Sequence, residues 1–122
     1  MKELKKLNHE FSVCKLATVN GIDWKATFTH LSKTDDELSL ICLTGKEPAD
    51  AIAVEAGWVA LKCSTGAQLS LGRVIADIAS RLEESHVSLF ILSTFSTDHI
   101  FFRKRDYEKA VLTLTQAGYS IV

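Results

Sequence analysis

Apolar and polar residues alternate along most of the chain, a pattern that is typical of β-strands with one buried face. In the first half this alternation predicts strands, or an extended segment, over residues 11–18, 24–32 and 38–44. The Asn-Gly pair at 20–21 and the charged run at 33–37 predict the turns between them. The stretch 49–56 is expected to be short and helical or irregular, because Gly57 ends it soon. The first half therefore reads as a β-meander.

The second half contains two segments with the helical period instead. One apolar stripe predicts a helix that ends at Ser85 and His86, and its members are Leu71, Val74, Ile75, Ile78 and Leu82. A second helix is predicted over residues 105–118, with Gly118 as the residue that follows its end. The shared face of that helix carries Tyr107, Val111, Leu114 and Ala117.

Strands predicted over 57–64, 87–93, 99–104 and 119–122 surround these two helices. Residues 57–122 therefore have the order β-α-β-β-α-β, in which two helices cover one face of an antiparallel sheet. We predict an α+β fold with a ferredoxin-like domain at 57–122, preceded at 1–56 by a trimmed, β-rich version of the same unit.

The strand that begins at Val87 is apolar on both faces. Val87, Leu89 and Ile91 point one way, whereas Phe90 and Leu92 point the other way. Helices cover only one face of a ferredoxin-like sheet, so the second face needs its own cover. The N-terminal half or a partner subunit is the expected cover.

Composition and charge narrow the classes of function. The chain has 122 residues, 47% of them hydrophobic, and a net charge of −1. This balance gives no bulk attraction for nucleic acid or for an anionic membrane. No apolar run is long enough to cross a bilayer, and the lysine-containing N-terminus lacks the apolar core of a secretory signal. A cytoplasmic protein without membrane or nucleic-acid partners is expected.

The three cysteines, Cys14, Cys42 and Cys63, all lie in apolar strand-like runs. Their number is odd and no CxxC pair occurs, so buried free thiols are expected. The four histidines are scattered along the chain. Neither a metal site nor a cofactor is predicted.

Three stretches resemble a known family. KTDDELSLIC (33–42), EAGWVALKC (55–63) and VSLFILSTFSTDHIFF (87–102) are similar to small bacterial tandem ACT-domain proteins and to the ACT modules of the CASTOR-type arginine sensors. The likeness covers nearly the whole chain, and the stretches keep their order and approximate spacing. It implies a regulatory fold that binds small ligands, most often amino acids, between two ACT units, usually without catalysis.

The resemblance also implies roles for individual residues. Ser88 and Leu89 would offer backbone groups and a hydroxyl to the amino-acid end of the ligand. Thr94 and Phe95 would line the pocket, and Asp98 would offer a carboxylate to a cationic group. Gly72 resembles the glycine of the loop before the first helix, where close backbone approach and a helix N-terminus favour a carboxylate.

The residue pattern by itself leaves other interpretations open. Residues 93–99 can be simply a polar hairpin end with a packed Phe95, because Ser, Thr and Asp side chains bond to nearby backbone. Asp98 and His99 are neighbours in a strand and so point to opposite faces, which argues against general-base chemistry and against an enzyme. Phe90, Phe101 and Phe102 could stack on RNA bases, but the charge is slightly acidic and no RNA-binding motif is present.

We therefore predict a regulatory ACT-domain protein that binds a small molecule, expected to be an amino acid. The junction between ACT units would lie within one chain or between chains of a homo-oligomer, and an unidentified effector protein would receive the signal. The alternative is an interaction module that has kept the ACT fold and lost its ligand. The apolar sheet supports it, as does the loop over residues 65–72, which is shorter than in relatives and lacks their Pro and Asp.

Overall fold

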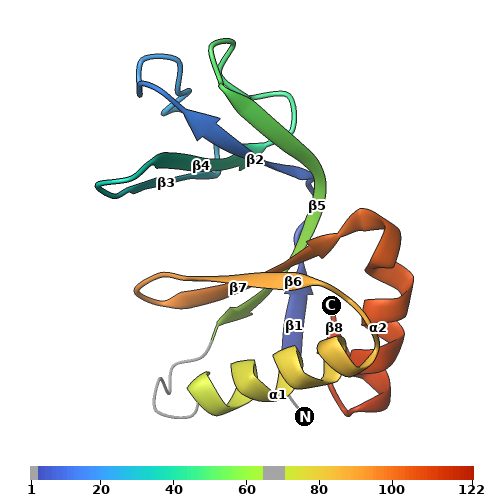
Figure 1. Ribbon diagram of the computed structural model, residues 1–122. Coiled ribbons are helices and arrows are strands. Elements are labelled where there is room, and N and C mark those ends of the chain that lie inside the picture. Colours follow the sequence, from blue (N-terminus) through green and yellow to red (C-terminus); the bar gives the residue numbers. More distant parts are fainter. Residues whose placement is uncertain (1–2, 65–70) are drawn as a thin grey trace. The chain divides into compact units, whose positions relative to one another are not determined.

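The computed structural model describes residues 3–64 and 71–122, which form two compact units (Figure 1). The N-terminal unit is His9–Trp58. The C-terminal unit is Val59–Val122 together with residues 3–8. Most of the loop predicted over 65–72 lies outside the described residues. None of the helices in the described part of the chain is long and apolar enough to cross a membrane.

The C-terminal unit contains the predicted β-α-β-β-α-β order. Its elements are the second half of β5 (Ala53–Ser64), α1 (Leu71–Glu84), β6 (Leu89–Ser93), β7 (Thr97–Arg103), the 3-10 turn η2 (Lys104–Asp106), α2 (Tyr107–Gln116) and β8 (Ser120–Ile121). The strands lie in the order β6-β7-β5-β1-β8, where β1 is Glu3–Lys6. The α+β, ferredoxin-like prediction is confirmed for this unit.

The structure differs from the expected division into units at 1–56 and 57–122, because strand β1 belongs to the C-terminal unit. It pairs antiparallel with β5, where Lys6 lies opposite Leu61, and parallel with β8, where Leu4 lies opposite Ile121. Leu4 is fully buried in the core of the C-terminal unit. A single apolar side chain between charged residues is too weak a pattern to predict a strand, so only the pairing reveals where this segment belongs.

One hydrophobic core holds the C-terminal unit together. Both helices contribute to it, and the sheet contributes side chains of one face. Its buried members include Leu61, Val74, Ile78, Leu82, Ile100, Phe102, Ala110 and Leu114. The predicted stripe of α1 is confirmed at Val74, Ile78 and Leu82, with Ile75 packed at the margin of the core. Tyr107 and Leu114 of α2 also contact this core, as does Ala117, the residue after the helix. Gly118 follows with φ +98°, as predicted for the residue beyond the helix end.

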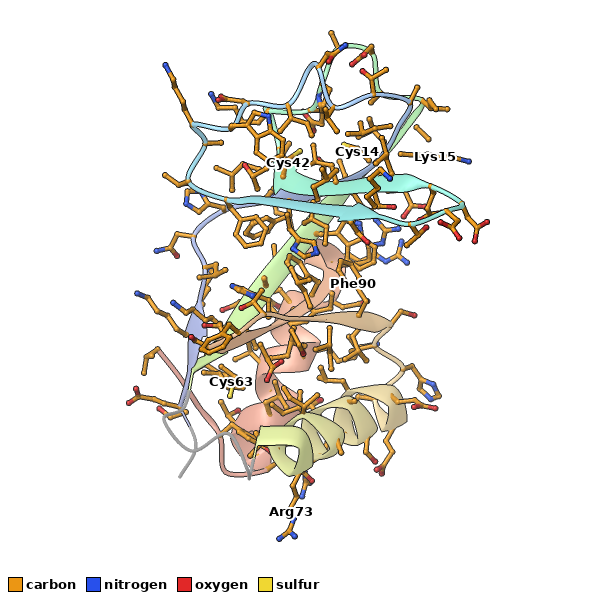
Figure 2. All side chains as sticks on the ribbon, turned by 90° about the vertical axis from the view of Figure 1, so that its left-hand side faces the viewer. Cys14, Lys15, Cys42, Cys63, Arg73 and Phe90 are labelled. Atoms are coloured by element: carbon orange, nitrogen blue, oxygen red, sulfur yellow. The ribbon has the colours of Figure 1, made fainter. Side chains whose placement is uncertain are left out.

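The β6–β7 hairpin has apolar side chains on both faces, as predicted. Leu89 and Ile91 pack against the helices' core. Phe90 lies on the other face and stacks on Phe101, with ring centroids 4.7 Å apart and an interplanar angle of 8°. Figure 2 labels Phe90 on this hairpin. That the N-terminal half or a partner subunit covers this second face stays a prediction.

The N-terminal unit is an antiparallel sheet of β2 (Phe11–Leu16), β3 (Thr29–Lys33), β4 (Leu38–Leu43) and the first half of β5. The strand order is β3-β4-β2-β5. The predicted β-meander is therefore wrong, because β4 lies between β2 and β3, which are consecutive in sequence. One face carries a small core of Cys14, Leu16, Ile22, Leu40 and Cys42.

All three cysteines are buried free thiols, as the sequence predicts (Figure 2). Burial raises the pKa of Cys14, and it raises the pKa of Cys42 to about 12. Neutral, buried thiols of this kind pack as small apolar side chains.

Strand β5 begins earlier than predicted, because residues 53–56 are strand and not a helical or irregular stretch. Val13 lies opposite Glu55 and Phe11 opposite Trp58, so β5 has one extra residue between these pairs. Gly57 lies in this β-bulge with φ +87°. The alanine-rich sequence favours a helix locally, but pairing with β2 decides the conformation.

Substitution of Gly57 tests this bulge. Gly57→Ala should lower the free energy of unfolding by about 1–2 kcal/mol, because an L-residue is strained at this positive φ even though open space surrounds the position. Urea unfolding measures the change, and Ala56→Ser is the matched control in the same strand. A Gly57→Ala protein as stable as the wild type would contradict the assignment.

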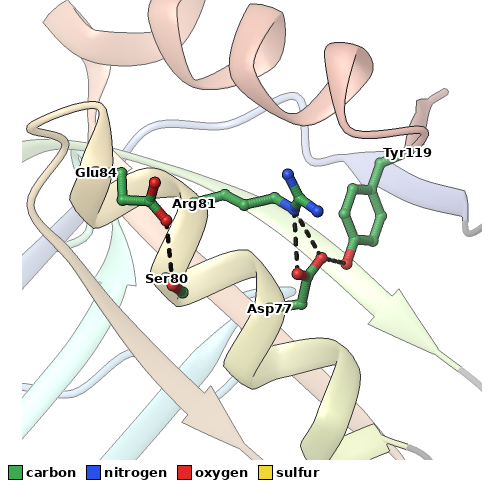
Figure 3. A network of polar contacts seen from close by, with 5 residues as sticks. All are labelled: Asp77, Ser80, Arg81, Glu84 and Tyr119. Atoms are coloured by element: carbon green, nitrogen blue, oxygen red, sulfur yellow. Dashed lines mark hydrogen bonds and ion pairs between the residues drawn. The ribbon is translucent and has the colours of Figure 1, made fainter.

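A polar network ties α1 to the segment before β8 (Figure 3). The Tyr119 hydroxyl donates to Asp77 Oδ2 at 2.5 Å, and Arg81 Nε donates to both Asp77 oxygens at 3.1 and 3.0 Å. The bond from Tyr119, followed by that from Arg81, lowers the pKa of Asp77. Burial, reinforced by the bond to Asp77, raises the pKa of Tyr119 to about 12.

Asp77→Asn should therefore destabilise the protein by about 1 kcal/mol at neutral pH, a modest value because the carboxylate is partly exposed. The folded-state pKa of Asp77 lies below its usual value of 3.8, so its stabilisation is present above that value and is lost as the pH falls through the folded-state pKa. Thermal unfolding at several pH values should show the two proteins converging in acid. Glu83→Gln, an exposed change on the same helix, should show no such convergence.

Candidate functional site

The turn between β6 and β7 holds the polar segment that the sequence singled out. Ser93 lies opposite Asp98 at the end of the ladder. The Thr94 backbone N–H and the Thr94 hydroxyl both donate to the Thr97 carbonyl, at 2.8 and 3.1 Å. These bonds close the hairpin, so the position of Asp98 depends on backbone geometry.

Asp98 is one of the few buried polar side chains, with 4% of its surface exposed. It has the strand parity of Ile100 and so faces the side of the sheet that the helices cover. The Ser93 hydroxyl donates to Asp98 Oδ1. A carboxylate buried with one hydroxyl partner retains acceptor capacity for a further donor.

His99 faces the other side of the sheet, where its ring lies 6.2 Å from that of Phe101. The prediction that Asp98 and His99 point to opposite faces is confirmed. The two side chains therefore do not form an acid–base pair on one substrate atom.

Gly72 lies at the same end of the C-terminal unit as this turn. Figure 1 shows the end of β5, the start of α1 and the β6–β7 turn at one end of the unit. Gly72 is the second residue of α1, so it belongs to the helix and not to the loop before it. The first turn of α1, with the positive end of its dipole, and the β6–β7 turn therefore lie toward the same end of the unit.

Ser88 and Leu89 lie at the other end of β6. At about 3.3 Å per residue, the five steps from Leu89 to Thr94 span roughly 17 Å. Ser88 is exposed before the strand, and Leu89 packs into the core opposite Phe102. A ligand at Asp98 would have to span most of β6 to reach Ser88 and Leu89 of the same copy.

Phe95 stands fully exposed at the tip of the hairpin. The alternative in which Phe95 is simply packed beneath a polar turn is therefore wrong. Thr94 is exposed as well, and both residues lie on the turn that precedes buried Asp98.

Sequence reasoning missed Ser93, the direct partner of Asp98. The five-residue spacing of a serine and an aspartate across a hairpin was the available signal, but it becomes a contact only once the turn length is known. Across residues 3–64 and 71–122, no three His, Cys, Asp or Glu side chains come together in a way that could hold a metal ion.

Removal of the Ser93 hydroxyl tests how much the buried carboxylate depends on it. Ser93→Ala should lower the free energy of unfolding by about 1.5 kcal/mol, the typical loss of a hydrogen bond to a charged acceptor. Ser96→Ala, an exposed change in the same turn, should be neutral. Equal stabilities of the two variants in urea unfolding would show that the Ser93–Asp98 bond contributes nothing.

Comparisons with known proteins bear on this unit. The ACT-domain family model matches residues 53–116, which run from β5 to the end of α2. No curated protein matches the chain.

Among solved structures, the fold is similar to a structural-genomics protein of Agobacterium tumefaciens, with 30% identity, a TM-score of 0.86, and 99% of this chain and 92% of that chain covered. It also resembles the ligand-free regulatory subunit of aspartate kinase from Thermus thermophilus, with 10% identity, a TM-score of 0.59 and 94% of each chain covered. Aspartate kinase of Clostridium acetobutylicum, described as an allosteric enzyme, matches with 15% identity and a TM-score of 0.63. That match covers 92% of this chain and 33% of the kinase.

Proposed function

The chain belongs to the ACT-domain family, and from this membership we propose that it is a regulatory protein that binds an amino acid and catalyses no reaction. The ligand lies at a junction of two ACT units. The C-terminal unit pairs either with the trimmed N-terminal unit, His9–Trp58, of the same chain or with a unit of a second copy of the chain in a homo-oligomer. The protein acts in the cytoplasm on an effector protein.

Similarity to regulatory proteins supports this proposal. The fold matches a separate regulatory subunit of aspartate kinase over nearly the whole length of both chains. It also matches about a third of an allosteric aspartate kinase. The resemblance of three stretches to CASTOR-type arginine sensors points in the same direction.

Buried Asp98 is the observation that carries the proposal. Its carboxylate lies at the rim of the C-terminal unit, at the end where α1 begins, and the Ser93 hydroxyl holds it. A cationic amino acid places its side-chain charge on Asp98 and its carboxylate near the helix start at Gly72. Ser88 and Leu89 contact a ligand only from another unit or another copy.

The regulatory mechanism is a population shift. A ligand that contacts both units of a junction stabilises their paired state by the difference between its affinities for the paired and separate states. The effector protein distinguishes those two states.

One observation favours the alternative of an interaction module without a ligand. Phe95 is a large apolar side chain with its whole surface exposed on an otherwise hydrogen-bonded turn. Such a side chain can anchor a protein partner as well as border a small ligand.

A thermal-shift screen of the twenty amino acids tests the proposal. L-arginine or L-lysine should raise the melting temperature, because a ligand at 100 times its dissociation constant stabilises by about 2.7 kcal/mol. Asp98→Asn should abolish the response, and the exposed change Glu108→Gln should retain it. No shift with any amino acid at millimolar concentration would leave the interaction module as the better function.

A further inference from the structure

The loop that joins β2 to β3, residues 17–28, carries an exposed Asn-Gly pair (Figure 1). Asn20 and Gly21 are the two central residues of a turn, which the Ile22 N–H closes by donating to the Val19 carbonyl at 3.2 Å. Neither central residue has a positive φ, which excludes the turn types that need a left-handed residue. The glycine therefore needs another explanation than backbone conformation.

Packing explains why position 21 is a glycine. A Cβ atom there would lie 2.9 Å from Asp50 Oδ1 and 3.0 Å from the Pro48 Cβ, so a larger residue would have to push one of these side chains aside. The residue after Asn20 is thus one whose backbone nitrogen no side chain covers.

Two groups that can react with each other are neighbours at this pair. The Asn20 side chain ends in a carbonyl carbon that carries an amino group, and the bond from the Gly21 nitrogen to this carbon would close a five-membered ring. In the part of the chain that the structure describes, neither the Asn20 side-chain amide nor the Gly21 N–H makes a hydrogen bond. No hydrogen bond therefore has to break before the two groups meet.

We propose that Asn20 is a site of spontaneous modification, at which Gly21 supplies the nucleophile and water is the only co-reactant. The Gly21 nitrogen gives up its proton and bonds to the side-chain carbonyl carbon of Asn20, and the side-chain nitrogen leaves as ammonia. Water then opens the cyclic imide at either of its two carbonyl carbons. The product is aspartate, or isoaspartate with the backbone running through the former side chain.

Either product places a new carboxylate beside that of Asp50. Asp50 Oδ1 lies within contact of the position that a Cβ on Gly21 would take, and Asp50 Oδ2 accepts from the Thr18 hydroxyl at 3.4 Å. Thr18 Oγ1 in turn accepts from the Asn20 N–H at 3.3 Å. Like charges at such short range repel each other. Isoaspartate also lengthens the backbone of the turn by one atom.

The turn holds part of the loop against the small core of the N-terminal unit. Ile22, whose N–H closes the turn, has 8% of its surface exposed and belongs to this core. Modification of Asn20 therefore loosens the loop and lowers the stability of the unit as the protein ages. This process goes beyond the proposed function, because neither a ligand nor an effector protein takes part in it.

The chain contains its own control for the rate of conversion. Its other asparagine, Asn8, is exposed as well, but it precedes His9, whose side chain hinders the attack. Trypsin places the two asparagines on separate peptides, residues 7–15 and 16–25. After weeks of storage of the folded full chain in mildly alkaline buffer, mass spectrometry should show Asn20 converted to two acidic isomers at least about tenfold faster than Asn8.

The same measurement on the chain unfolded in guanidinium chloride shows whether the fold protects the pair. The folded chain should convert at a rate within about tenfold of the unfolded chain, because no hydrogen bond protects the Gly21 N–H. Asn20 that stays intact in the folded chain, or that converts no faster than Asn8, would overturn the proposal.

Two serine variants test the consequence for stability. Asn20→Ser removes the reacting amide, and Asn8→Ser is the matched control. During storage the midpoint of urea unfolding should fall for the wild type and for Asn8→Ser, and it should stay constant for Asn20→Ser. An equal fall in all three proteins, or a constant midpoint in a wild type whose Asn20 has converted, would contradict the loosening of the loop.

Discussion

An amphipathic helix is stable only when its apolar stripe is covered, and the stripe of α1 imposes this requirement on the C-terminal unit. Val74, Ile78 and Leu82 bury against sheet residues such as Leu61 and Ile100. Each large aliphatic side chain buried in this way contributes about 1.5–3 kcal/mol. The strands β5, β6 and β7 present one apolar face to the helices. Residues on the same face at the ends of these strands therefore lie at the edge of the core. Asp98, two residues before Ile100 in β7, lies at this edge of the core.

A continuous strand serves both units of the protein. The first half of β5 pairs with β2, and the second half pairs with β1 and β7. Gly57 lies where the strand passes from one set of partners to the other, and its positive φ accommodates the extra residue. The N-terminal strand β1 belongs to the C-terminal unit, so that unit is built from two segments of the chain that are far apart in sequence.

The candidate site at Asp98 depends on both the sheet and the turn. Asp98 is buried on the sheet face that the helices cover, and the Ser93 hydroxyl donates to its carboxylate. A carboxylate held in this way favours a cationic group.

The sequence by itself determined the element order of residues 57–122, the stripe of α1 and the burial of the cysteines, because these depend on local periodicity and on side-chain type. The resemblance pointed to Asp98, but it also assigned Ser88 to the same ligand. Strand β6, which extends by about 3.3 Å per residue, separates Ser88 from the turn next to Asp98. The strand conformation of residues 53–56, the place of β1 and the Ser93–Asp98 contact were decided only by tertiary structure. Each of these depends on pairing between segments distant along the chain or across a turn, and such pairing leaves no periodic signal within either segment.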